Sequence, residues 1–210
     1  MSTTKSTRWR STLAASALLA CLPLPALAHH VMDGQTPVTW WQGLLSGLAH
    51  PLFGIDHFLF LVALGLLSFG VRGAWRPAMS FMIGVSIGVL IHVYGLSLPA
   101  GEVLVALTLG IAGAALALHY QGRGRVLMTA LALAGVLHGY AFGESIAGAD
   151  QVVIGSYLLG LAIMQAVVCG LVVAAARHLE SRSRDMAPGA VRFMGAVIGA
   201  AGLVLMGIAV

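Results

Sequence analysis

The chain has 210 residues, of which 59% are hydrophobic, and it also contains 27 glycines. Charged residues make up only 9% of the sequence, against about 25% in soluble globular domains. So few charges cannot cover the surface of a water-soluble protein, and the composition also excludes a disordered chain, a coiled coil and a disulfide-linked secreted domain. Because the mean hydropathy is +0.95, we expect an integral membrane protein.

The first 28 residues have the organisation of a secretory signal peptide. Three basic residues lie within the first ten, an apolar run follows over 13–22, and small residues occupy 26 and 28. A retained helix is the alternative, but an apolar run this short spans a bilayer poorly. We therefore predict cleavage after Ala28 and a single transmembrane domain over residues 29–210.

Cleavage would leave a chain with eight arginines, seven acidic residues and no lysine, since Lys5 is the only lysine in the sequence. A chain without lysine has neither a Walker A nucleotide-binding loop nor a Schiff-base lysine. The near-neutral balance also leaves no basic surface for nucleic acid. The function classes that depend on these features are therefore excluded.

Apolar runs of roughly 17–26 residues predict six transmembrane helices after the signal peptide. The fold class is therefore all-α, a polytopic helical bundle. The predicted spans are approximately 52–70, 78–97, 103–120, 126–143, 151–176 and 193–210.

The breaks between these spans alternate in charge. All eight arginines of the predicted mature chain lie in three breaks. In the other two breaks the only charged residues are acidic. The positive-inside rule places the arginine-containing breaks in the cytoplasm. We therefore predict a multi-pass protein of the bacterial inner membrane with both mature ends outside. The arginine-containing breaks are 71–77, 121–125 and 177–192, and the acidic breaks are 98–102 and 144–150.

Glycines recur every four residues on three of the predicted spans. Such spacing lets helix backbones approach each other closely in lipid. We expect this packing within one chain, with a homo-oligomer as the less favoured alternative. The glycines are Gly84 and Gly88, Gly135, Gly139 and Gly143, and Gly195 and Gly199.

Six ionisable side chains within or beside the spans are the candidate functional residues. Burying such groups in lipid costs about 2.5–3.5 kcal/mol each on insertion scales, so they usually mark ion paths or binding sites. They come from three spans and, with the predicted topology, all lie near the outer face. Imidazole and carboxylate together suit nickel, cobalt, zinc or copper better than magnesium or calcium. The six are His50, Asp56, His57, His92, His138 and Glu144.

The first predicted span begins irregularly. Pro51 and Gly54 interrupt the apolar sequence, and a proline removes one backbone hydrogen-bond donor. We expect a short interfacial helix at 39–49, a turn that carries His50, and Asp56 at the start of the spanning helix. Asp56 would either cap that helix or orient a metal-binding histidine.

Other interpretations of these residues remain open. Each histidine could simply bond a backbone carbonyl, a zinc hydrolase could use the same cluster with Glu144 as base, and His92 with His138 could ligate haem. His29 and His30 could capture metal at the mature N-terminus or belong to a flexible tail.

Two segments resemble the signature motifs of the HupE/UreJ family: HPLFGIDH at 50–57 and HGYAFGES at 138–145. The resemblance extends over essentially the whole predicted mature chain. It implies a secondary permease for nickel or cobalt, carried as substrate, with no tightly bound cofactor and no enzymatic activity.

Carried over to this sequence, the family motifs imply functional roles for His50, Asp56, His57, His138 and Glu144. Many family members have a second histidine where this chain has Phe142. The loss of an imidazole there would lower metal affinity, change the preferred metal, or mark a subgroup that prefers cobalt.

Overall fold

The computed structural model describes residues 35–120, 124–184 and 186–209. The predicted signal peptide at 1–28, and His29 and His30, lie outside the described residues. Every regular element that is described is helical, so the prediction of an all-α bundle is confirmed. The elements are α2 (Trp40–Phe53), α3 (Ile55–Phe69), α4 (Trp75–Val93), α5 (Gly101–Ala117), α6 (Gly124–Gly143), the 3₁₀ turn η2 (Glu144–Ile146), α7 (Gln151–Arg182) and α8 (Met186–Ile208).

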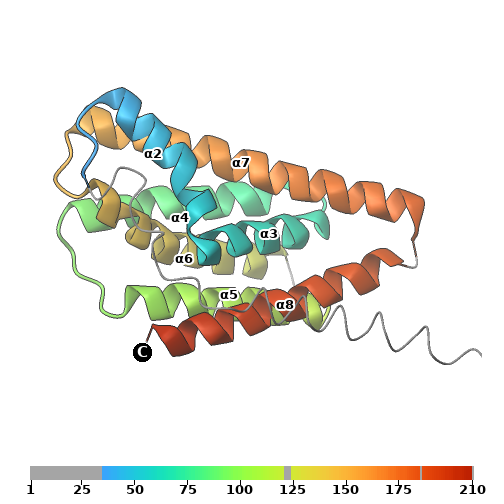
Figure 1. Cartoon of the computed structure of the whole chain (residues 1–210). Helices are drawn as coiled ribbons and strands as arrows, with labels where there is room; N and C mark the ends of the chain where they lie inside the picture. Colours follow the sequence, from blue (N-terminus) through green and yellow to red (C-terminus); the bar gives the residue numbers. More distant parts are fainter. Residues whose placement is uncertain (1–34, 121–123, 185, 210) are drawn as a thin grey trace, which may run out of the picture.

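Helix α3 lies inside the bundle and packs against α4, α5, α7 and α8. Three pairs of helices form the most extensive contacts, α4 with α6, α5 with α8, and α2 with α7. Figure 1 shows that α2 and α7 begin, and α6 and α8 end, at the same end of the bundle. The core around α3 is apolar and includes Phe60, Leu64, Phe81 and Leu109, each no more than 1% exposed.

The described helices meet the requirement for membrane spans to different degrees. Four stretches are long and apolar enough on their own: α4, α6 continued through η2, α7 and α8. Helix α5 is shorter, with 17 residues, and α2 and α3 qualify together only as a pair bent by 80°. Each predicted span overlaps one of the described helices. That six of them cross the membrane stays a prediction.

The predicted break before the first span is confirmed, but its position was wrong. Helix α2 continues through Pro51 to Phe53, so His50 lies in its last turn and not in a loop. A proline ring fits a helical φ, but it removes one hydrogen bond and crowds the carbonyl four residues before it, so α2 continues only two residues beyond Pro51. The chain leaves the helical conformation at Gly54, where ψ is 107°, and α3 starts at Ile55.

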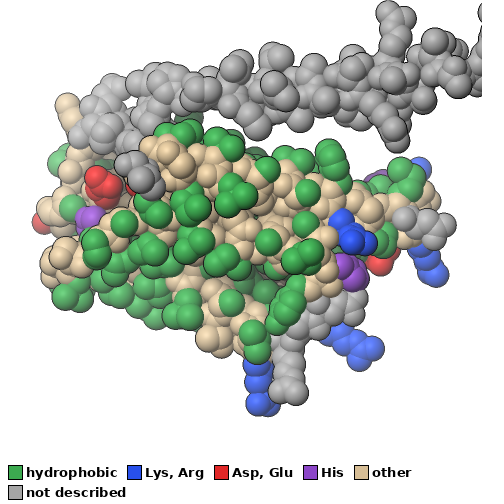
Figure 2. Space-filling view, turned by 90° about the horizontal axis from the view of Figure 1, so that it is seen from below, with side chains coloured by type: hydrophobic (Ala, Val, Ile, Leu, Met, Phe, Trp, Pro, Cys, Tyr) green, Lys and Arg blue, Asp and Glu red, His purple; other side chains and the backbone are tan. Residues whose placement is uncertain are grey.

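The predicted alternation of charge agrees with the arrangement of the helices. Figure 2 shows hydrophobic side chains over the middle of the molecule, and the arginine side chains in that view gather toward one end. In Figure 1 this is the end where α7 passes into α8, opposite the start of α2. All described arginines therefore belong to connections at one end of the bundle or to the helix turns beside them.

The glycines at four-residue spacing lie at contacts between helices of the same chain. A Cβ atom built on Gly84 or Gly88 would overlap backbone atoms of α6, and one on Gly135 or Gly139 would overlap backbone atoms of α4. Such close approach is the packing that small residues allow in lipid. Gly113 of α5 meets the backbone of α8 in the same way.

Candidate functional site

The centre of the candidate site is a pair of histidines from two helices. His57 lies in the first turn of α3 and His138 in the second half of α6. Their Nδ1 atoms are 2.8 Å apart, which is hydrogen-bonding distance. His57 is 7% exposed and His138 is fully buried. The two motifs that the sequence singled out thus meet through one histidine of each.

Aromatic rings surround this pair. The Phe142 ring lies 4.2 Å from the His57 ring and the Phe60 ring 4.3 Å from the His138 ring, measured between centroids. Phe81 stacks on Phe60 at 5.1 Å. Because these rings exclude water, the electrostatic interactions of the imidazoles are stronger here than in solvent.

The hydrogen bonds of Thr108 on α5 indicate which ring nitrogen of His138 carries the proton. The Thr108 hydroxyl donates to the Val105 carbonyl at 2.7 Å, so its oxygen is left to accept from His138 Nε2–H at 3.0 Å. A neutral His138 then has a bare Nδ1 atom, which accepts a hydrogen bond from the Nδ1–H group of His57. The lone pair that a cation would need therefore points from His138 toward His57.

His50 extends the site from α2. Its ring centroid lies 6.1 Å from that of His57 and 5.0 Å from that of Phe142. Its Nδ1 atom is 3.0 Å from the hydroxyl of Tyr157, which also lies 2.9 Å from the Phe142 carbonyl oxygen. The Ser145 hydroxyl donates to the same tyrosine oxygen at 3.1 Å. Helices α2, α6 and α7 thus meet at the Tyr157 hydroxyl.

Sequence reasoning missed Thr108 and Tyr157. Both are polar residues within apolar runs, and that is the signal that could have found them. A polar residue in a span usually bonds another helix, but the sequence does not indicate which one.

Gly54 and Asp56 set the position of His57. A Cβ atom on Gly54 would lie 2.7 Å from His57 Cδ2, so only glycine leaves room for the imidazole here. The Asp56 carboxylate accepts a hydrogen bond from the His57 backbone N–H at 2.8 Å. Gly54 is the N-cap residue, so the idea that Asp56 occupies the cap position was wrong, although its carboxylate satisfies a first-turn N–H.

The structure does not bring His92 and Glu144 to the histidine pair. The His92 ring faces Tyr140 at 4.6 Å, and a Cβ atom on Gly143 would lie 2.6 Å from the Cβ atom of His92. Glu144 begins the turn η2 and is exposed. Among the described residues no three His, Cys, Asp or Glu side chains form a group that could hold a metal ion. The site is therefore a pair of imidazoles with a third nearby, and not a closed metal cage.

Comparison with known proteins identifies the family. The family model described as HupE / UreJ protein matches residues 17–205. The chain belongs to the HupE/UreJ family. This confirms the resemblance carried by the two motifs.

A curated HupE/UreJ relative is Protein HupE of Rhizobium leguminosarum bv. viciae, which is 30% identical over 127 residues. The match covers 60% of this chain and 64% of the relative, so the chain spans less than two thirds of that protein's length. No solved structure matches the chain. Family and helices together describe a multi-pass membrane protein.

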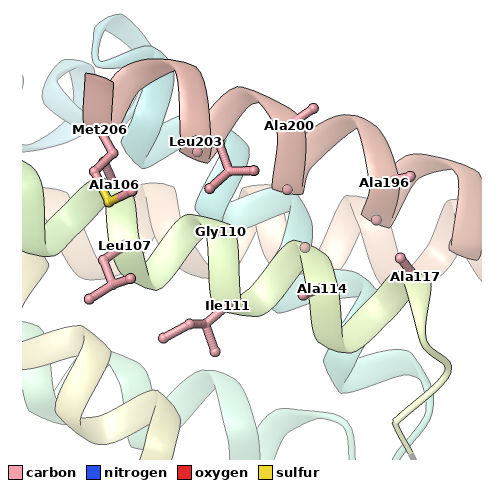
Figure 3. Close-up of a pocket in the computed structure, with 14 residues that line it drawn as sticks. Ala106, Leu107, Gly110, Ile111, Ala114, Ala117, Ala196, Ala200, Leu203 and Met206 are labelled. Carbon is pink, nitrogen blue, oxygen red and sulfur yellow. The ribbon is translucent and has the colours of Figure 1, made fainter. Parts of the chain in front are cut away.

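An apolar groove between α5 and α8 is a second feature of this HupE/UreJ protein. It has a volume of about 370 Å³ and only apolar side chains and glycines line it, as Figure 3 shows. Without nitrogen, oxygen or sulfur ligands beyond one methionine, it offers no metal site. Its lining includes Leu107, Gly110, Ile111, Gly199, Leu203 and Met206.

We predict that Thr108→Val changes the tautomer of His138. Valine has nearly the shape of threonine but cannot accept the Nε2–H hydrogen bond, so the preference for a proton on Nε2 is lost. Long-range ¹H–¹⁵N correlation NMR of histidine-labelled protein reports the tautomer directly. Thr108→Ser, which keeps the hydroxyl, should retain the wild-type pattern. Identical spectra for Thr108→Val and the wild-type protein would contradict the assignment.

Proposed function

We propose that this protein carries a divalent transition-metal cation, nickel or cobalt, across the bacterial inner membrane by secondary transport. The observation that carries the proposal is the His57–His138 pair, two buried imidazoles from two helices whose Nδ1 atoms face each other. Membership of the HupE/UreJ family supports it, because the resemblance implies this class of cargo.

The chemistry of the pair suits a transported ion. A cation that enters between the rings takes the place of the 2.8 Å hydrogen bond, and for this the Nδ1 proton of His57 must move to its Nε2 atom or leave the ring. Imidazole nitrogen is a good ligand for nickel and cobalt. Two imidazoles bind more weakly than a complete cage of four or more ligands, and weak binding favours exchange over retention.

His50 is the nearest further imidazole for such an ion. Its ring lies 6.1 Å from that of His57, while Tyr157 holds its Nδ1 atom. A small movement of α2 about the bend at Gly54 would change the distance between these two histidines, since His50 and His57 lie on opposite sides of that bend. We propose that this movement adds or removes the third ligand during transport.

The charged residues at the two ends of the bundle indicate how the protein is oriented in the membrane. We propose that the arginine-rich end faces the cytoplasm, according to the positive-inside rule. Exposed Glu102, Glu144 and Asp150 then lie at the outer end, where they raise the local concentration of cations. In this arrangement Glu144 acts by attraction and not as a ligand.

His57→Ala should abolish saturable metal uptake while membrane insertion is retained, because it removes one half of the imidazole pair. Radiotracer uptake of nickel and of cobalt, measured separately in cells that express the chain, tests this and names the cargo. His178→Ala is the matched control, since His178 is exposed at the arginine-rich end. Normal uptake by His57→Ala would remove the basis of the proposed site.

Phe142→His should strengthen metal binding, because the Phe142 ring contacts the rings of both His50 and His57. A third imidazole there should lower the dissociation constant for nickel about tenfold or more, the scale of ligand-shell changes. Titration of the purified protein with nickel measures this, and Phe142→Leu controls for the loss of the ring. An affinity no tighter than that of Phe142→Leu would argue against a cation at this position.

A further inference from the structure

Gln165 is a buried polar side chain that the histidine site does not use. It lies on the inward face of α7, about two helical turns beyond Tyr157, and is 1% exposed. Neither its Oε1 nor its Nε2 atom has a hydrogen-bond partner among the described residues. Buried amides are normally paired, since an amide can make several hydrogen bonds. The unpaired amide therefore points to a polar ligand inside the bundle.

Two more buried polar groups lie at the contact between α3 and α7, one helical turn beyond Gln165. Ser68 of α3 is fully buried, and its hydroxyl has no conventional hydrogen-bond partner among the described residues. Cys169 lies one turn beyond Gln165, is 3% exposed, and has its thiol beside Ser68. The helices touch closely here, since a Cβ atom on Gly65 would lie 3.2 Å from the Cys169 carbonyl oxygen.

Ser68, Gln165 and Cys169 lie farther along their helices than the histidine pair, toward the arginine-rich end of the bundle. Helices α3 and α7 run in the same direction in Figure 1. From His57 to Ser68 the chain advances along α3 by about 16 Å, at the usual rise per residue. The polar groups thus lie on the side of the histidines that faces the cytoplasm in the proposed orientation.

We propose that Gln165, Ser68 and Cys169 form a second, inner binding step for the transported cation. This inference rests on the proposed function. The amide oxygen of Gln165 and the hydroxyl oxygen of Ser68 can each offer a lone pair to nickel or cobalt, and the neutral thiol of Cys169 adds only a weak one. None of the three is a carboxylate, so the ion is held weakly and passes onward. The path of the cation therefore follows the contact between α3 and α7.

Gln165→Leu tests this step. Leucine has a similar size, so a merely structural Gln165 could be replaced with unchanged uptake and with equal or greater stability, because an unpaired polar group is removed. We expect radiotracer uptake to fall about tenfold or more, the scale at which changes in the surroundings of a metal act. The thermal unfolding temperature of the purified variant should be unchanged or higher.

The same assay includes His57→Ala and, as control, Ser86→Ala, which removes a hydroxyl that donates to the Met82 carbonyl of its own helix. If Gln165→Leu retains full uptake while His57→Ala loses uptake, the inner binding step is wrong and the proposed function is unaffected. Absence of uptake by the wild-type protein overturns both. If Gln165→Leu does not reach the membrane, Cys169→Ala decides: reduced uptake supports the inner step, and wild-type uptake overturns it.

Discussion

The hydrogen bond between His57 and His138 is the interaction on which the rest of the structure depends. It joins α3 to α6 at a depth where water is excluded, and there an unpaired imidazole would be costly. The two rings bond each other through their Nδ1 atoms, and the bond to Thr108 places the proton of His138 on Nε2, which leaves its Nδ1 atom to accept from His57. A cation that replaces this bond enters a position already lined by nitrogen. In the proposed function, the interaction that stabilises the histidine pair is therefore also the one that a transported cation has to break.

The fold brings these two rings together by bending one helix and packing others tightly. The break at Gly54 lets α3 start inside the bundle, which places His57 at the depth of His138. The glycines of α4 and α6 allow those helices to touch along their backbones, so that Phe81 of α4 packs against His138 at 5.6 Å. Tyr157 of α7 then ties α2 to α6 through its hydroxyl. The same bend gives α2 a way to move relative to α3.

Much of the fold could be predicted, because lipid imposes simple rules on length, hydropathy and charge. The helices and the alternation of arginines follow from those rules, and Pro51 with Gly54 predicted the break before α3 but not its position. The site could be predicted only in part. Sequence position gives the depth of a residue in the membrane but not its direction around the helix axis, so His92 and Glu144 were grouped with His138 although they face elsewhere. Thr108 and Tyr157 were missed because their partners lie on other helices.

X-ray absorption spectroscopy of the nickel-loaded, purified protein would determine whether His57 and His138 together bind the cation. Imidazole rings give a recognisable scattering pattern around the metal. We expect scattering from at least two imidazoles in the wild-type protein and the loss of one in His138→Ala. A first shell of oxygen atoms alone, or a spectrum that His138→Ala leaves unchanged, would contradict it.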